Sequence, residues 1–98
     1  MNKRVTCTVS GRVQRVLYRD TTRRKARSLQ LAGFVQNQSN GTVLVVAEGE
    51  EEQLKELLSH LEKGSLFSKV DEVKALWGEY SGEFKSFTIV YSSLWDRL

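Results

Sequence analysis

The chain has 98 residues, of which 40% are hydrophobic and 28% are charged, and its formal net charge is +3. This composition is typical of one globular domain, and no stretch approaches the roughly 20 apolar residues that a membrane span needs. The N-terminus lacks the apolar core of a signal peptide. The single cysteine excludes an internal disulfide and a metal site built from cysteines, so we expect a cytoplasmic protein.

The charge is divided unevenly along the chain. Residues 1–27 hold nine of the 15 Lys and Arg residues but only one of the 12 acidic residues, so the remainder of the chain is net negative. This asymmetry favours an anionic partner for the N-terminal part. The partner could be a small phosphate compound or a nucleic acid.

Residues 4–10 alternate between apolar and polar side chains, which predicts a half-buried strand. Cys7 lies in the apolar register of that strand and is therefore predicted to be a core residue. The following stretch, residues 9–19, carries three arginines and no acidic residue, and it leads into a helical pattern. Because the first amides of a helix have no intrahelical acceptor and carry the positive end of the helix dipole, this stretch predicts an anion site, with phosphate as the favoured anion.

A basic amphipathic helix is predicted to begin at residues 20–22, whose Asp and Thr side chains favour helix starts, and to end before Gly33. Its basic side is interpreted as a solvated face in preference to a nucleic-acid surface. Two strands are then predicted at residues 34–38 and 42–48, joined by a tight turn at Asn40-Gly41. The second of them is apolar on both sides, which predicts a central place in the sheet.

The clearest helical pattern covers residues 50–63, with a leucine stripe at helical spacing and Gly64 as its stop. His60 lies off that stripe, so we expect an exposed surface residue and not a base or a metal ligand. Further strands are predicted from residue 70 to 77 and from 87 to 91, with a turn at 78–82. The tail, residues 92–98, has no usable period, and whether Trp95 and Leu98 dock on the domain is left open.

The predicted order is therefore β-α-β-β-α-β-β. Two right-handed βαβ crossovers interleave into a ferredoxin-like α+β sandwich, a five-stranded sheet with an extra C-terminal strand and both helices on one face. This fold alone selects no function, since it hosts enzymes, RNA binders and regulatory domains.

Two segments of the chain form recognisable motifs. Residues 9–19 read Val-Ser-Gly-Arg-Val-Gln and then Val-Leu-Tyr-Arg after Arg15. Residues 33–37 read Gly-Phe-Val-Gln-Asn and are followed by Gly41-Thr42-Val43 and Gly49. These two segments resemble the first and the second signature of the acylphosphatase family. The resemblance covers residues 4–91 and implies one acylphosphatase-like domain spanning 1–98. It also implies a core strand order of 4-1-3-2, with the fifth strand beside the second.

The resemblance further implies hydrolysis of acyl phosphates to a carboxylate and inorganic phosphate by a monomer, without metal, cofactor or covalent intermediate. Arg19 matches the family's phosphate-binding catalytic arginine, and Asn37 matches the asparagine that holds the attacking water. The phosphate cradle, whose backbone amides would receive the phosphate oxygens, consists of Arg12, Val13, Gln14, Arg15, Val16, Leu17 and Tyr18. The residue chemistry agrees, because a guanidinium fork suits two phosphoryl oxygens and an activated substrate needs a positioned water more than a strong base.

Arg15 departs from the family pattern, which has glycine there. If that position needs a positive φ, a non-glycine residue costs on the order of 1 kcal/mol, and its side chain could either cover the phosphate site or point outward and attract anions. The alternative function is therefore an acylphosphatase-like module that binds phosphate or RNA with weak or no turnover. RNA is disfavoured, because the middle strands lack the aromatic pairs on which bases stack.

Overall fold

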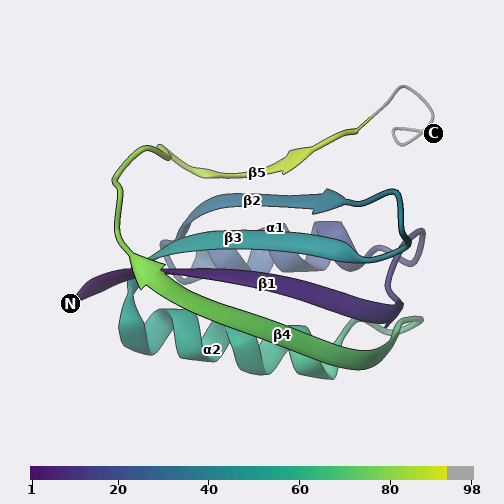
Figure 1. Ribbon diagram of the computed structural model, residues 1–98. Coiled ribbons are helices and arrows are strands. Elements are labelled where there is room, and N and C mark those ends of the chain that lie inside the picture. The colour runs from purple at the N-terminus through teal and green to yellow at the C-terminus, as the bar shows by residue number, and fades with distance from the viewer. Residues whose placement is uncertain (93–98) are drawn as a thin grey trace.

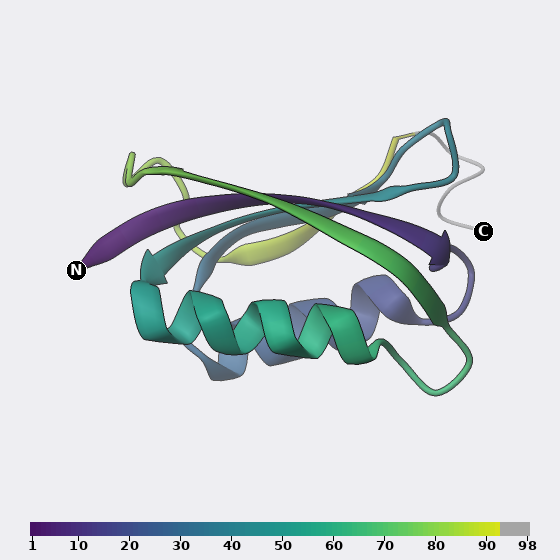
Figure 2. The same cartoon turned by 60° about the horizontal axis from the view of Figure 1, so that its bottom comes forward.

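A five-stranded sheet and two helices that cover one of its faces make up the computed structural model, which describes residues 1–92 (Figure 1, Figure 2). The elements are β1 (Asn2–Arg12), α1 (Tyr18–Ser28), β2 (Ala32–Asn37), β3 (Val43–Glu50), α2 (Glu51–Lys63), β4 (Lys69–Glu79) and β5 (Phe87–Val90). The strand order is β4-β1-β3-β2-β5, antiparallel except for the parallel β2–β5 pair. This confirms the predicted ferredoxin-like sandwich with its extra strand.

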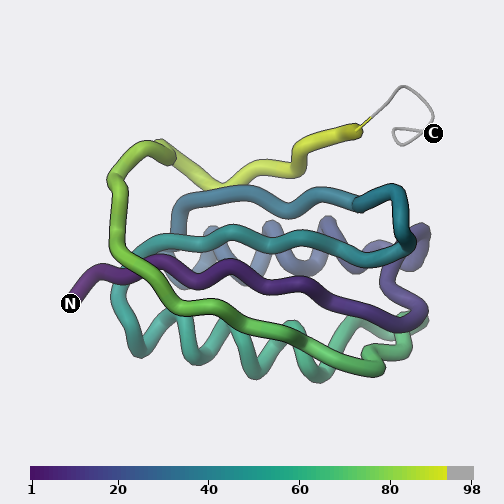
Figure 3. The backbone as a smooth tube through the Cα atoms, in the orientation of Figure 1, coloured from purple at the N-terminus to yellow at the C-terminus, as the bar shows by residue number. Residues whose placement is uncertain are grey.

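The core lies between the sheet and the two helices. Cys7 is fully buried on the inward face of β1, as predicted, and burial raises the pKa of its thiol to about 12. Three residues of the predicted leucine stripe of α2 are also fully buried: Leu54, Leu57 and Leu61. The backbone trace in Figure 3 shows β1 running between β3 and the edge strand β4. The pairing of β1 with β3 runs from Asn2 to Val9, whereas its pairing with β4 continues to Arg12.

The end of α1 differs from the prediction. Gln30, not Gly33, takes the left-handed conformation after the helix, with φ 59°. The N–H of Gln30 donates to the carbonyl of Arg27 at 3.0 Å, and the N–H of Leu31 donates to that of Ala26 at 2.9 Å. These two bonds form a Schellman motif, which closes the helix without glycine. Gly33 lies inside β2, where a Cβ would come within 1.9 Å of a β3 carbonyl oxygen.

β4 contains a bulge at Asp71 beside β1. The pairing with β1 shifts there, and the shift places Val70 and Val73 on the same side although they are three residues apart. Gly11 lies opposite the bulge with φ 121°, and a Cβ there would come within 2.2 Å of the carbonyl oxygen of Lys69. β4 also continues to Glu79, so the turn predicted to begin at residue 78 begins later.

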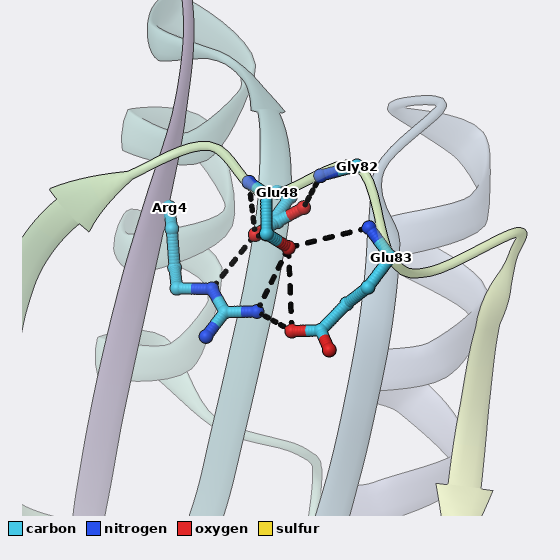
Figure 4. A network of polar contacts seen from close by, with 5 residues as sticks. Arg4, Glu48, Gly82 and Glu83 are labelled. Atoms are coloured by element: carbon cyan, nitrogen blue, oxygen red, sulfur yellow. Dashed lines mark hydrogen bonds and ion pairs between the residues drawn. The ribbon is translucent and has the colours of Figure 1, made fainter.

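A buried carboxylate holds the connection between β4 and β5 (Figure 4). Glu48 of β3 accepts hydrogen bonds from the amide and hydroxyl of Ser81, at 3.0 and 2.8 Å, and from the amide of Gly82 at 3.0 Å. Arg4 donates to Glu48 at 2.7 Å and also pairs with Glu83. Burial opposes the ionisation of Glu48, but the hydrogen bonds from Ser81, Arg4 and Gly82 outweigh it and lower its pKa.

His60 is half-buried, so the expectation of an exposed surface histidine is wrong. Burial and then the charges of Lys25 and Lys63 lower its pKa. Within residues 1–92, no helix is long and apolar enough to cross a membrane. Trp95 and Leu98, whose docking was left open, lie outside the described residues.

Candidate active site

The connection between β1 and α1 carries the predicted phosphate cradle. Leu17 caps α1 with φ 63°, so the helix begins at Tyr18, two residues before the predicted start at 20–22. The Leu17 carbonyl accepts the first helical hydrogen bond, from the amide of Thr21 at 3.0 Å, but its side chain makes no capping bond. The cap therefore offers no side-chain acceptor to the amides of the first turn, which suits this helix end to an external anion.

Arg15 has the left-handed backbone that the glycine of the family pattern suggests, with φ 60°. Its side chain is exposed. Of the two orientations considered from the sequence, exposure favours the outward one, in which the guanidinium adds positive potential without filling the cradle. The cradle thus contains two non-glycine residues, Arg15 and Leu17, in a conformation that costs roughly 1–2 kcal/mol each.

Gln14 ties the cradle to the β2–β3 hairpin. Its side-chain amide nitrogen donates to the carbonyls of Gln38, at 2.9 Å, and of Thr42, at 2.8 Å. Asn37 is the last residue of β2, opposite Val43 of β3, and its exposed fraction is 7%. It shares the inward side of β2 with other buried residues of the alternation. The Gln14 bridge therefore brings the hairpin that carries Asn37 against the cradle.

The other side of the cradle is tied to α2 and the loop that follows it. The hydroxyl of Ser65 donates to the carbonyl of Val16 at 2.9 Å. Tyr18 is 1% exposed, and its hydroxyl donates to the carbonyl of Leu61 at 2.8 Å. Burial raises the pKa of Tyr18. Because the side chains of Tyr18 and of the equally buried Val13 lie in the core, these two residues can face a ligand only through their backbone.

Arg19 lies in the first turn of α1, with its guanidinium carbon 5.2 Å from the centre of the Tyr91 ring. β5 pairs with β2 in parallel, with Val90 beside Gln36, so Tyr91 follows at the level of Asn37. Sequence reasoning missed this contact, because it used Tyr91 only as the last apolar residue of an alternating strand. The fold therefore places the end of β5, which Tyr91 follows, at the level of Asn37, the residue predicted to hold the attacking water.

The charges around the cradle are positive. Arg12 ends β1 and is exposed, opposite Lys69 of β4. The acidic residue of the first turn, Asp20, is balanced by Arg23 and by Arg24, the latter at 3.0 Å. Among the residues that the structure describes, no group of three or more His, Cys, Asp or Glu side chains is arranged to hold a metal ion. The site can therefore offer guanidinium groups and backbone amides to an anion.

Comparison with known proteins connects this geometry to one family. Residues 5–89 match the model of the family described as Acylphosphatase. A protein named acylphosphatase from Caldanaerobacter subterraneus is 42% identical over 89 residues, which cover 91% of this chain and 99% of that protein. Another from Thermus thermophilus is 43% identical over 79 residues, covering 81% and 90%.

A solved structure shares the arrangement as well as the sequence. The crystal structure of acylphosphatase from Bacillus subtilis superposes with a TM-score of 0.88 at 34% identity, covering 93% of this chain and all of that one. The family match spans β1 to β5, including the cradle and Asn37. The chain therefore belongs to the acylphosphatase family.

Proposed function

We propose that this chain hydrolyses the carboxyl–phosphate bond of acyl phosphates, releasing a carboxylate and inorganic phosphate. The observation that carries the proposal is the Gln14 bridge, which joins a basic cradle at a helix start to the hairpin of Asn37. The names of the relatives support the same reaction. The exposure of Arg15 weighs against the alternative of a phosphate-binding module without turnover, because that alternative depended on an obstructed cradle.

The substrate's phosphate group is held by the backbone amides of the cradle, residues 12–18, and by the guanidinium of Arg19. Two guanidinium N–H groups can donate to two phosphoryl oxygens in one plane, and this cation keeps its proton at any working pH. The dipole of α1 adds positive charge at the same end. Phosphoryl transfer depends mainly on such positioning and charge stabilisation, so these groups supply most of what the reaction needs.

The side-chain amide of Asn37 orients the attacking water. As the water oxygen bonds to phosphorus, the bond between phosphorus and the acyl oxygen breaks, and its electron pair leaves with the carboxylate. A proton of the water passes to the phosphate group. Because the carboxylate is a good leaving group, this scheme needs no strong base on the protein, and it uses no metal ion, cofactor or covalent intermediate.

The proposal includes the physiological setting. We infer a cytoplasmic monomer in which residues 1–98 form one domain, with a small acyl phosphate and not a nucleic acid as the partner. The outward side chains of β1 and β3 include Thr6, Thr8, Leu44 and Val46. These four side chains give bases no aromatic surface to stack on. The one cysteine is buried in the core.

The test is the release of phosphate from benzoyl phosphate by the intact chain. Arg19→Ala and Asn37→Ala should each reduce kcat/KM roughly 10²- to 10³-fold, by analogy with lost oxyanion donors. Arg24→Ala is the matched control, since this arginine lies on the same helix with its side chain 76% exposed, and it should retain activity. Circular dichroism confirms folding of each variant. Undiminished turnover in either of the first two variants would refute the assignment.

A further inference from the structure

We infer, building on the proposed function, that Leu17, Leu66 and Phe67 bind the acyl group of the substrate. These three residues, the apolar rim, would select acyl phosphates with a bulky apolar acyl group, either aromatic or branched aliphatic. The inference depends on three observations: the fixed loop that presents two of these side chains, its attachment to the cradle, and the direction in which the acyl group must leave.

The loop between α2 and β4, residues 64–68, is held by its own hydrogen bonds. The Ser68 hydroxyl accepts from the amide of Ser65 at 2.7 Å and donates to its carbonyl at 3.0 Å, and the Ser68 amide donates to the same carbonyl at 3.1 Å. This closed turn leaves Leu66 88% and Phe67 62% exposed. Two large apolar side chains on a fixed turn are costly to leave in water, which is typical of a binding surface.

This loop is attached to the cradle. The hydroxyl of Ser65 donates to the carbonyl of Val16 at 2.9 Å, and the residue after Val16 is Leu17, which is 69% exposed. Figure 2 shows the α2–β4 connection beside the β1–α1 connection at the same end of the molecule. The three exposed apolar side chains therefore come from two segments that meet at the margin of the phosphate cradle.

The sheet order gives the direction in which the acyl group leaves. The cradle follows β1, with β4 as its neighbour on one side and β3 and then β2 on the other (Figure 1). Asn37 ends β2, so the attacking water approaches from the β2 side. In an in-line displacement, the leaving group departs opposite the nucleophile. The acyl group therefore lies toward β4, whose first residue, Lys69, directly follows the loop of the apolar rim.

The composition of the loop indicates the class of acyl group. Residues 64–68 read Gly-Ser-Leu-Phe-Ser and contain no charged side chain, and the hydroxyls of Ser65 and Ser68 are engaged in the bonds just described. The three side chains of the apolar rim thus offer apolar surface and no hydrogen-bonding group to a polyhydroxylated acyl chain. An aromatic ring would cover this surface, whereas the single methyl group of acetyl phosphate would cover little of it.

The experiment compares kcat/KM for benzoyl phosphate and acetyl phosphate. The variant Leu66→Ser/Phe67→Ser should lower the value for benzoyl phosphate by roughly tenfold and that for acetyl phosphate by less than about twofold. The inhibition constant of inorganic phosphate should not change, because the cradle is intact. Leu76→Ser is the matched control: this leucine is 74% exposed on β4, away from the loop, and its replacement should alter neither substrate.

Equal losses on both substrates, or no loss on either, would overturn the inference about the acyl group. Failure of the wild-type chain to hydrolyse either substrate would instead refute the proposed function. The two substituted side chains are exposed, so the variant should fold, and circular dichroism with a thermal midpoint checks this. The single variant Phe67→Ser is a second test, and it should also lower kcat/KM for benzoyl phosphate more than for acetyl phosphate.

Discussion

Replacing Arg15 separates the two effects of a non-glycine residue in the cradle. Arg15→Ala removes the guanidinium but keeps the Cβ, and Arg15→Gly removes both. The backbone at this position has φ 60°, and the side chain is exposed. The first variant therefore measures the charge, and the difference between the two variants measures the conformational strain.

The expected difference in stability between Arg15→Gly and Arg15→Ala follows from two opposing contributions. A left-handed conformation costs a residue with a Cβ about 1–2 kcal/mol, whereas glycine adds freedom to the unfolded chain worth about 0.4–1 kcal/mol. Arg15→Gly should therefore be more stable than Arg15→Ala by roughly 0.5–1 kcal/mol, or about 2–6 °C in Tm for a domain of this size. Arg15→Ala itself should lie within about 0.5 kcal/mol of wild type, as exposed substitutions usually do.

Urea unfolding and initial rates with benzoyl phosphate are the assays. Because the backbone is already left-handed and the side chain is exposed, kcat should stay within about twofold of wild type in both variants. At low ionic strength, kcat/KM should be lower in both variants than in wild type, and this difference should narrow as added salt screens the charge of Arg15. A tenfold rise in kcat for Arg15→Gly would show an obstructed cradle and refute the reasoning. Leu17, with φ 63°, offers the matched Ala and Gly pair, whose stability difference should have the same sign.

Three further predictions concern one group that stabilises the fold, Glu48, and two that contact the site, Tyr91 and Gln14. Glu48→Gln should lower the free energy of unfolding at neutral pH by about 2–4 kcal/mol. The folded-state pKa of Glu48 is lowered, so its stabilisation is present at neutral pH and lost as pH falls below about 4; urea midpoints across that range should show this loss in wild type but not in the variant. Tyr91→Leu should reduce kcat/KM about two- to fivefold by removing the ring beneath Arg19, and Tyr91→Phe should not. Gln14→Ala should lower stability by about 1–3 kcal/mol and also lower kcat, because two hairpin carbonyls lose their donor; unchanged kcat would contradict the bridging role.

The elements that the sequence predicted well are those whose signals are local. The Asn40-Gly41 turn, the leucine stripe of α2 and Gly64 with φ 75° each depend on residues within one or two turns of chain. The two ends of α1 were misplaced for a shared reason. Both use a left-handed residue with a side chain, Leu17 and Gln30, against intrinsic preference, so propensity pointed to Asp and Thr at one end and glycine at the other.

The candidate site also has features that a local sequence signal indicates and contacts that no local signal indicates. The motif predicted residues 12–18 as the cradle and Asn37 as the residue that holds water, and both assignments stay predictions. The contacts that Tyr91 and Ser65 make depend on segments far away in sequence. Ser65 reaches Val16 across 49 positions, for example. Neither periodicity nor turn chemistry carries information about such pairs, so they could be seen only once the layers were assembled.

The cradle shows how this fold can hold a strained loop without glycine. Two of its residues have unfavourable backbone conformations, and each strained segment is flanked by a side-chain hydrogen bond to a different element. Gln14 reaches the β2–β3 hairpin, Ser65 reaches in from the α2–β4 loop, and Tyr18 reaches the end of α2. Because β1 lies between β3 and β4, its C-terminal end has such partners on both sides. Phosphoryl transfer requires positioned amides. Tertiary contacts can therefore hold these amides in place even where local sequence preference opposes the backbone conformation.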